Sequence, residues 1–259
     1  MSPISPAHPE LRVSVVVPAR DEEELVADCI GALARQEGVS PAEFEVLLVL
    51  DRCRDATRER ALAVGRAHPR MRLHLLEGPG LGAGHARRTG MDAAASRLAE
   101  IGETGGLVAS TDADTVTDRD WIRAQIDLVR SGARAIGGRI EILPGDRAAL
   151  PPAALEARER SVRLRHLRAL ADAPHGADHG HFSGASMSLT AADYARVGGL
   201  EPKVALEDEA LERALGRHGV PIIRSDSVRV HTSGRTRGRA PRGLAHDLAE
   251  AVRRSRPPG

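Results

Sequence analysis

Residues 107–114 read Leu-Val-Ala-Ser-Thr-Asp-Ala-Asp, an apolar strand that ends on two carboxylates, and this stretch decides the fold prediction. Leu107–Ser110 has the nearly continuous apolar character of a strand that is buried on both faces. Asp112 and Asp114 follow two residues apart, so both side chains can face one pocket across a tight turn. Hard divalent cations such as Mg²⁺ are typically coordinated by carboxylate oxygens of the protein together with phosphate oxygens of a ligand. The triplet alone is a common pattern, and its position directly after a strand makes it informative.

Strands and helices alternate on both sides of this stretch. The predicted strands of the first part are 13–17, 46–50, 72–76, 107–110 and 135–143. The predicted helices are 21–37, 55–67 and 118–130, and a further helix follows the glycine-rich turn 78–84 and reaches residue 100. This alternation predicts an α/β fold with a doubly wound, mostly parallel sheet and helices on both faces. Ligands of such sheets bind beyond the carboxyl ends of the strands, so the residues after each strand are the candidate site.

The second part of the chain is less regular. Pro151 and Pro152 open a helix over 153–170 that is basic on one face, and a loop rich in Gly and His follows at 174–184. Later elements are predicted as strands 187–190 and 222–230 and helices 191–197, 208–218 and 241–254. No internal repeat is visible, so one domain covering 1–259 is the simplest organisation.

Composition narrows the class of protein. The chain has 259 residues, 41% of them hydrophobic, and a net charge of +1, so it is globular and attracts no nucleic acid through its overall charge. Two cysteines give neither a disulfide framework nor zinc spacing. No signal peptide or transmembrane stretch is visible, and we expect a cytoplasmic protein. Residues 229–256 hold eight arginines, either as a solvated tail or as a patch for an anionic ligand.

Three acidic loop tips are predicted to meet at one edge of the sheet. They are residues 18–22, 51–55 and 111–114. Their mutual repulsion is costly unless a cation or hydrogen-bond donors lie between them. The alternative is that some of these acids cap helices, which suits Asp21, Asp55 and Asp118 well but fits Asp112 and Asp114 less well.

With these motifs, the chain over residues 13–231 resembles the GT-A glycosyltransferases of the family 2 type. Val-Val-Val-Pro-Ala-Arg-Asp-Glu-Glu at 15–23 is similar to that family's first strand and turn, which hold the nucleobase and ribose. The resemblance implies donor contacts at Pro18, Ala19, Arg20 and Glu22. Residues 49–57 are similar to the second-strand motif, although Leu50, Arg52, Cys53 and Arg54 replace its usual residues. Asp51 keeps its place and is the implied contact to the base edge.

A glycine-rich stretch at residues 80–90 is similar to the family's loop ending in Ala-Arg-Asn-x-Gly. The resemblance implies that Gly82 and Arg87 contact the nucleotide or its diphosphate, with Arg88 in the place of the usual Asn. Glycines before a helix N-terminus also suit an anion, and an ordinary flexible turn is the alternative. Residues 182–200 resemble the stretch beside the donor sugar, where Gly184 would let the backbone approach closely.

The resemblance also assigns the catalytic and metal roles. Residues 206–211 are similar to the acidic pair that supplies the base, which implies Asp208 first and Glu207 second; capping of a helix is the alternative for Asp208. Asp114 is expected to bind Mg²⁺ or Mn²⁺. Asp112 would contact the metal or the ribose, and Ala113 the donor. His231 is implied as a metal ligand, against a loop histidine without a role.

The implied function is a metal-dependent, inverting transfer of sugar from a UDP- or GDP-sugar to a small, phosphorylated or lipid-like acceptor. Residues 1–115 would bind the donor, 116–235 would hold acceptor and base, and 236–259 form a basic tail. Alternatives are a retaining enzyme similar to glucosyl-phosphoglycerate synthases, a sugar-phosphate nucleotidyltransferase, which residues 19–22 disfavour, and a non-catalytic nucleotide-sugar-binding module. The role of His175, His179 and His181, and the choice between monomer and homodimer, stay open.

Overall fold

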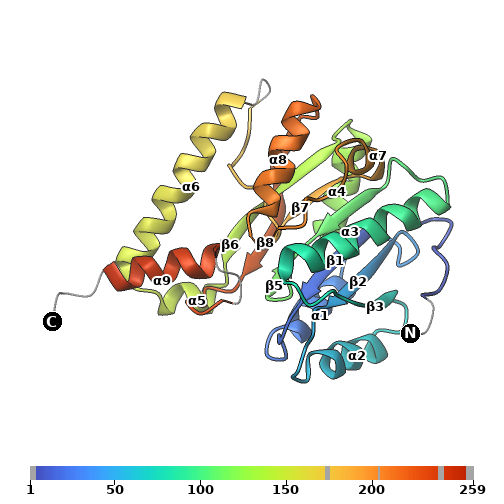
Figure 1. Ribbon diagram of the computed structural model, residues 1–259, viewed down its shortest axis with the longest axis horizontal. Helices are drawn as coiled ribbons and strands as arrows, with labels where there is room; N and C mark the ends of the chain where they lie inside the picture. The colour runs from blue at the N-terminus through green and yellow to red at the C-terminus, as the bar shows by residue number, and fades with distance from the viewer. Residues whose placement is uncertain (1–3, 173–175, 204, 239–241, 255–259) are drawn as a thin grey trace.

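The computed structural model describes residues 4–172, 176–203, 205–238 and 242–254 (Figure 1). One eight-stranded sheet runs through these residues in the order β3-β2-β1-β4-β7-β6-β8-β5. The strands are β1 Val13–Ala19, β2 Phe44–Leu50, β3 Leu73–Glu77, β4 Leu107–Ser110, β5 Thr115–Thr117, β6 Ala135–Ile142, β7 Met187–Thr190 and β8 Ile222–Thr232. The helices are α1 Val26–Ala34, α2 Thr57–Ala67, α3 Ala83–Glu100, α4 Trp121–Arg130, α5 Pro144–Ala149, α6 Pro152–Asp172, α7 Ala191–Arg196, α8 Glu207–Arg217 and α9 Leu244–Arg254.

The sheet is mostly parallel, as the sequence predicts. β3, β2, β1 and β4 are parallel neighbours, and β6 and β8 form a second parallel pair. β7 lies antiparallel between β4 and β6, and β5 is antiparallel to β8. The predicted strand 135–143 therefore does not lie beside β4. β7, which follows it by more than forty residues, takes that place and joins the two parts of the chain into one sheet.

Two apolar layers cover the sheet, because alternate side chains of each strand point to opposite faces. On one face Val15 of β1 belongs to a core with Ile30 of α1 and Ile122 of α4. On the other face Val16 packs in a core with Met91 of α3. α6 and α9 lie against each other and away from most of the sheet (Figure 1).

Helix starts differ from the sequence prediction. α1 begins at Val26 instead of residue 21, because Asp21 has a left-handed backbone (φ 51°) that no helix can include. Capping is wrong for Asp21, which accepts the backbone N–H of Arg54, and for Asp118, since α4 has Asp120 at its N-cap. Asp55 precedes the α2 N-cap and does accept the N–H of the first helical residue. The short elements β5 and α5 were not predicted.

Candidate active site

A cavity of about 1710 Å³ opens at the carboxyl ends of β1, β2 and β4. Single-ligand pockets usually measure about 300–1,000 Å³, so this cavity has room for two substrates. Its wall includes every candidate site residue of the sequence except His231: Pro18, Ala19, Arg20, Glu22, Asp51, Gly82, Arg87, Asp112, Ala113, Asp114, Gly184, Glu207 and Asp208. The fold therefore brings together residues from both halves of the chain in one cleft.

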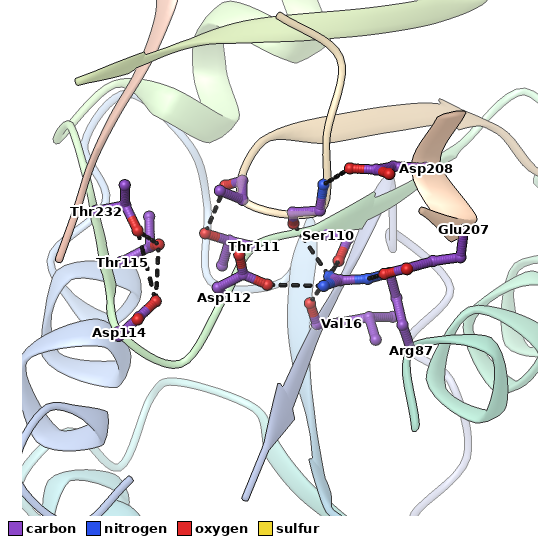
Figure 2. Close-up of polar contacts among 12 residues, drawn as sticks. Val16, Arg87, Ser110, Thr111, Asp112, Asp114, Thr115, Glu207, Asp208 and Thr232 are labelled. Carbon is purple, nitrogen blue, oxygen red and sulfur yellow. Dashed lines mark hydrogen bonds and ion pairs between the residues drawn. The ribbon is translucent and has the colours of Figure 1, made fainter. Parts of the chain in front are cut away.

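Arg87 of α3 is the centre of this cleft and is 3% exposed. Its Nη2 lies 2.7 Å from Asp112 Oδ1 and its Nε lies 3.1 Å from Glu207 Oε1. Its Nη1 donates to the Ser110 hydroxyl and, at 3.1 Å, to the Gly184 carbonyl (Figure 2). Burial by itself would lower the pKa of Arg87, but the two carboxylates outweigh burial and raise it. Arg87 thus ties the end of β4 to the start of α8, and its contact to a diphosphate stays a prediction.

Gly184 is required by Arg87 in this structure. A Cβ atom at this position would lie 2.4 Å from Arg87 Nη2, so the buried guanidinium would have to shift. The Gly184 N–H also donates to Asp208 Oδ2 at 3.3 Å. The glycine therefore serves the packing of the buried guanidinium. Close approach of a sugar to the same backbone stays a prediction.

Asp208 lies in the first turn of α8, on the wall of the cavity. It is not the N-cap, because that position belongs to Leu206, so capping does not account for it. Burial in the first place, and then the neighbouring Glu207, raise the pKa of Asp208 to about 6, while Arg87 opposes the rise. A carboxylate of this pKa is ionised at neutral pH and is more basic than an ordinary aspartate. Its geometry and basicity both suit proton abstraction.

Asp114 forms the second acidic position of the site. Arg235 Nη2 lies 2.7 Å from Asp114 Oδ2, and the same guanidinium binds both carboxylate oxygens of Glu22 at 2.7 and 2.8 Å. Burial raises the pKa of Asp114 to about 7, nearby Asp112 adds to the rise, and Arg235 opposes it. Sequence reasoning did not identify Arg235. The only signal was the arginine-rich composition of residues 229–256.

The structure does not bring His231 to Asp114. Neighbouring residues of a strand point to opposite faces, and Thr232 takes the position beside Asp114, with its Oγ1 3.5 Å from Oδ1 (Figure 2). His231 instead lies 3.2 Å from Asp118 and 3.9 Å from Glu141. We therefore leave His231 out of the candidate metal ligands.

The chemistry of the remaining acids fits a divalent metal. Glu22 after β1 and the pair Asp112 and Asp114 after β4 offer hard carboxylate oxygens on the wall of one cavity, and this is the donor type that Mg²⁺ and Mn²⁺ prefer. Burial of Asp114 beside another acid makes a cation favourable there, and Arg235 supplies one in this structure. A bound metal would stabilise the charge of a leaving diphosphate.

A second group of potential ligands lies elsewhere. Among the described residues, Asp21, Cys53 and Asp55 offer ligand atoms within 4.8 Å of one another. Asp21 accepts the N–H of Arg54, and Asp55 accepts the N–H groups of Glu23 and Thr57. These hydrogen bonds explain the cluster without an ion.

At the end of β2, Asp51 organises the glycine-rich turn at residues 78–84. It is 1% exposed, and its carboxylate accepts the N–H groups of Gly80 and, at 2.9 Å, of Gly82. Gly82 has φ 105°, a conformation that favours glycine, and no atom lies within 4 Å of a Cβ placed there. Arg20 Nη1 lies 3.9 Å from Asp51. The contact of Asp51 to a base edge stays a prediction.

Two histidines of the loop at residues 174–184, His179 and His181, are buried. His181 lines the cavity and its Nδ1 accepts the Ile140 N–H at 3.0 Å. His179 contacts the Ser225 carbonyl at 3.3 Å. Burial lowers the pKa of both rings, which therefore stay neutral at pH 7. His175 lies outside the described residues.

Comparison with known proteins decides the family. The model of a family described as "Glycosyltransferase like family 2" matches residues 9–254, nearly the whole chain. The chain belongs to this family. It is a glycosyltransferase of the family 2 type, and the resemblance stated from its motifs is confirmed. No curated protein matches the chain in sequence closely enough to be counted as a relative.

Solved structures show that the fold is GT-A. A mannosyltransferase from Pyrobaculum calidifontis, in complex with GDP-Man and Mn²⁺, has a TM-score of 0.65 at 21% identity over 95% of this chain. The chain spans 66% of that protein. TarS of S. aureus, in complex with UDP-GlcNAc, has a TM-score of 0.61 at 15% identity. The match covers 94% of this chain and 72% of the TarS chain. Glucosyl-3-phosphoglycerate synthase of Mycobacterium tuberculosis, in complex with Mn²⁺, UDP-Glc and phosphoglyceric acid, has a TM-score of 0.57 at 17% identity. The match covers 93% of this chain and 77% of that protein.

Membrane-spanning helices were also sought in the described part of the chain. None of its helices combines the length and the apolar character that crossing a bilayer requires.

Proposed function

We propose that this glycosyltransferase moves a sugar from a UDP- or GDP-sugar to an acceptor hydroxyl, with inversion at the anomeric carbon. The single observation that carries the proposal is the cavity that holds Asp208 on one side of Arg87 and the pair Asp112 and Asp114 on the other. The structural relatives crystallised with GDP-Man, UDP-GlcNAc and UDP-Glc support a nucleotide-sugar donor.

The proposed chemistry needs one base and one stabilised leaving group. The acceptor oxygen forms a bond to the anomeric carbon as the bond from that carbon to the diphosphate oxygen breaks. Asp208 takes the hydroxyl proton, and the nucleoside diphosphate leaves with the electron pair. Asp112 and Asp114 would hold Mg²⁺ or Mn²⁺ at the diphosphate. Arg87 positions Asp112 and Glu207 through an ion pair with each carboxylate.

Donor contacts are assigned to the remaining lining residues. Pro18, Ala19, Arg20, Glu22, Asp51, Gly82 and Ala113 follow β1, β2 and β4 and face the same cavity. Open α/β sheets bind ligands at this edge, which supports the assignment. Glu207 is the weaker candidate for the base, because Arg87 already binds its carboxylate.

The direct test incubates the protein with UDP- and GDP-sugars, Mn²⁺ and candidate acceptors, and follows nucleoside diphosphate release and product by NMR. We expect a new glycoside whose anomeric configuration is opposite to that of the donor. A product with the donor's configuration would establish the retaining alternative. Formation of a nucleotide sugar from a sugar phosphate and a nucleoside triphosphate would establish the nucleotidyltransferase.

A pH profile tests the role of Asp208. Because its pKa is raised to about 6 and its ionised form is the base, the rate should be highest above pH 6 and fall at lower pH. Between pH 6 and pH 4 each further unit should lower the rate about tenfold, as for one essential ionised group. Rates at saturating donor and Mn²⁺ check this. A rate independent of pH from 4 to 7 would rule out Asp208 as the base.

The acceptor side of the cavity is basic. Arg158, Arg165 and Arg168 of α6 line it at helical spacings that place them on one face. Arg165 lies 3.9 Å from Asp247, while neither Arg158 nor Arg168 has an acidic partner within 4 Å among the described residues. Burial first, and then Arg165, lower the pKa of Arg158 to about 10. Positive side chains with so few acidic partners support an acceptor that carries phosphate or carboxylate groups.

Replacing one of these arginines tests the acceptor class. Arg158→Gln should raise the KM for phosphoglycerate about tenfold and leave kcat nearly unchanged, because one charge-assisted hydrogen bond is worth about 1.5–3 kcal/mol. Arg163→Gln is the matched control, since Arg163 is exposed on the same helix and outside the cavity. Equal KM values for phosphoglycerate and glycerate in every variant would contradict an anionic acceptor.

A further inference from the structure

Arg235 occupies the point where the proposed metal must bind. Its guanidinium lies 2.7 Å from Asp114 Oδ2 and holds both oxygens of Glu22 at 2.7 and 2.8 Å. Asp114 is the residue assigned to the metal, and Glu22 lies in the turn after β1 on the same cavity wall. A divalent cation cannot bind Asp114 Oδ2 while this guanidinium stays, because the two cations would repel each other at contact distance.

The two arginines of the acidic edge differ in their freedom to move. Arg87 has 4% of its side chain exposed and donates to protein acceptors through all three nitrogens. Arg235 has 28% of its side chain exposed, and the partners of its guanidinium among the described residues are the carboxylates of Asp114 and Glu22. Long, partly exposed arginine side chains change rotamer readily. Arg235 is therefore the exchangeable cation and Arg87 the fixed one.

The backbone beside Arg235 stays in place without the side-chain contacts. The Gly234 N–H donates to Asp146 Oδ2 at 2.7 Å, and the Ser233 N–H donates to the Asp114 carbonyl at 3.1 Å. These bonds anchor the segment after β8. Exchange therefore requires only the side chain of Arg235 to swing, with no rearrangement of the fold.

We propose that Arg235 is the resident cation of the acidic edge in the donor-free protein, and that it yields Asp114 to the divalent metal when the metal and nucleotide bind. The inference rests on the proposed function, since it takes Asp114 as the metal ligand. Released from Asp114, the guanidinium lies in the cavity where a diphosphate brings negative charge. Arg235 is then a positioning residue that joins metal binding to nucleotide binding.

Exchange makes metal and nucleotide binding mutually dependent. Without nucleotide, Mn²⁺ must displace the Arg235 guanidinium from Asp114, so Mn²⁺ binds weakly. With nucleotide, the diphosphate offers ligands to the metal and an anionic partner to the guanidinium, so each ligand strengthens binding of the other. Removal of Arg235 should raise Mn²⁺ affinity in the absence of nucleotide and reduce this coupling.

The test is a titration of Mn²⁺ followed by electron paramagnetic resonance of the free ion, with and without UDP or GDP. We expect Arg235→Gln to bind Mn²⁺ alone at least about tenfold more tightly than the original protein, and to show a smaller gain on addition of nucleotide. Arg235→Lys keeps the positive charge but loses the planar guanidinium that binds two carboxylate oxygens at once. Its Mn²⁺ affinity should therefore lie between those of the original protein and Arg235→Gln. Arg237→Gln should behave like the original protein, because Arg237 is exposed and has no ion pair among the described residues.

Asp114→Asn separates this inference from the proposed function. If Asp114→Asn abolishes Mn²⁺ binding and Arg235→Gln leaves the Mn²⁺ affinity unchanged or weaker, Arg235 does not compete with the metal and the inference fails alone. If Asp114→Asn binds Mn²⁺ like the original protein, the assigned metal site is wrong and both fail. Melting temperatures of all variants, measured in parallel, show that each is folded.

Discussion

Asp208→Asn is expected to lower kcat about 10³-fold while leaving the KM for the donor within about threefold of its original value. General base catalysis contributes roughly 10²–10⁴-fold, and asparagine cannot accept the acceptor's proton. Asparagine has nearly the shape of aspartate, and its one amide oxygen can still accept one of the two N–H groups, of Gly184 and Glu209, that bind the Asp208 carboxylate. We therefore expect the start of α8 to stay folded. Steady-state rates with the donor and acceptor found active provide the measurement.

Glu209→Gln is the matched control for this variant. Glu209 lies in the same helical turn and also on the cavity wall, but its side chain is exposed and pairs with Arg213 at 3.6 Å. Its replacement should change kcat by less than about twofold, since exposed pairs contribute little. The acidic limb of the pH profile should also disappear in Asp208→Asn. A rate for Asp208→Asn within threefold of the original would show that another group is the base.

Arg87→Met is expected to destabilise the protein by about 3 kcal/mol. Removal of one member of a buried ion pair leaves an uncompensated charge, which typically costs about 3–5 kcal/mol. Here Glu207 is 7% exposed and loses its cation, while Asp112 is partly solvated and suffers less. For a chain of this size the melting temperature should fall by about 6–12 °C. Urea unfolding measures the free energy directly.

Arg123→Met supplies the comparison. Arg123 lies 2.7 Å from Asp127, the same distance as in the Arg87–Asp112 pair, but both partners are about half exposed. We expect a much smaller loss of stability than for Arg87→Met, because exposed ion pairs are weak. Equal stability losses in the two variants would contradict the role of Arg87 as a buried tie. Unchanged stability of Arg87→Met with weakened UDP binding would instead assign Arg87 to the diphosphate.

The strands and their acidic ends could be predicted from the sequence because they depend on local pattern. Val13–Val17 and Leu107–Ser110 are nearly continuous apolar runs, which is typical of strands covered on both faces. Asp51 and Asp112 follow such runs and lie on the cavity wall. These acidic positions of the site could therefore be predicted from the sequence, because each one follows an apolar run.

Contacts between distant segments could not be predicted in this way. Glu207 is 120 residues from Arg87, and nothing local indicates that α8 delivers a carboxylate to that guanidinium. Arg235 is one of eight arginines in residues 229–256, and only the fold shows that it reaches Glu22, 213 residues away.

The misplacement of His231 has a different cause. A shift of one residue along a strand turns a side chain to the opposite face, and the sequence does not specify which of His231 and Thr232 points toward Asp114. The pairing of β5 with β8 settles this register, and β5 is a three-residue strand that has no apolar pattern of its own. The polar site therefore depends on an element that sequence pattern does not reveal.

The measurement that tests the account most directly is the melting temperature with UDP- and GDP-sugars, each with and without Mn²⁺. At a donor concentration of about 100 Kd, binding to the folded state adds about 2.7 kcal/mol. We predict that at least one donor raises the melting temperature by about 5–10 °C only when Mn²⁺ is present, and that Asp114→Asn loses this rise. If no donor shifts the melting temperature, or if the shift persists in Asp114→Asn, the cavity is not a metal-dependent nucleotide-sugar site.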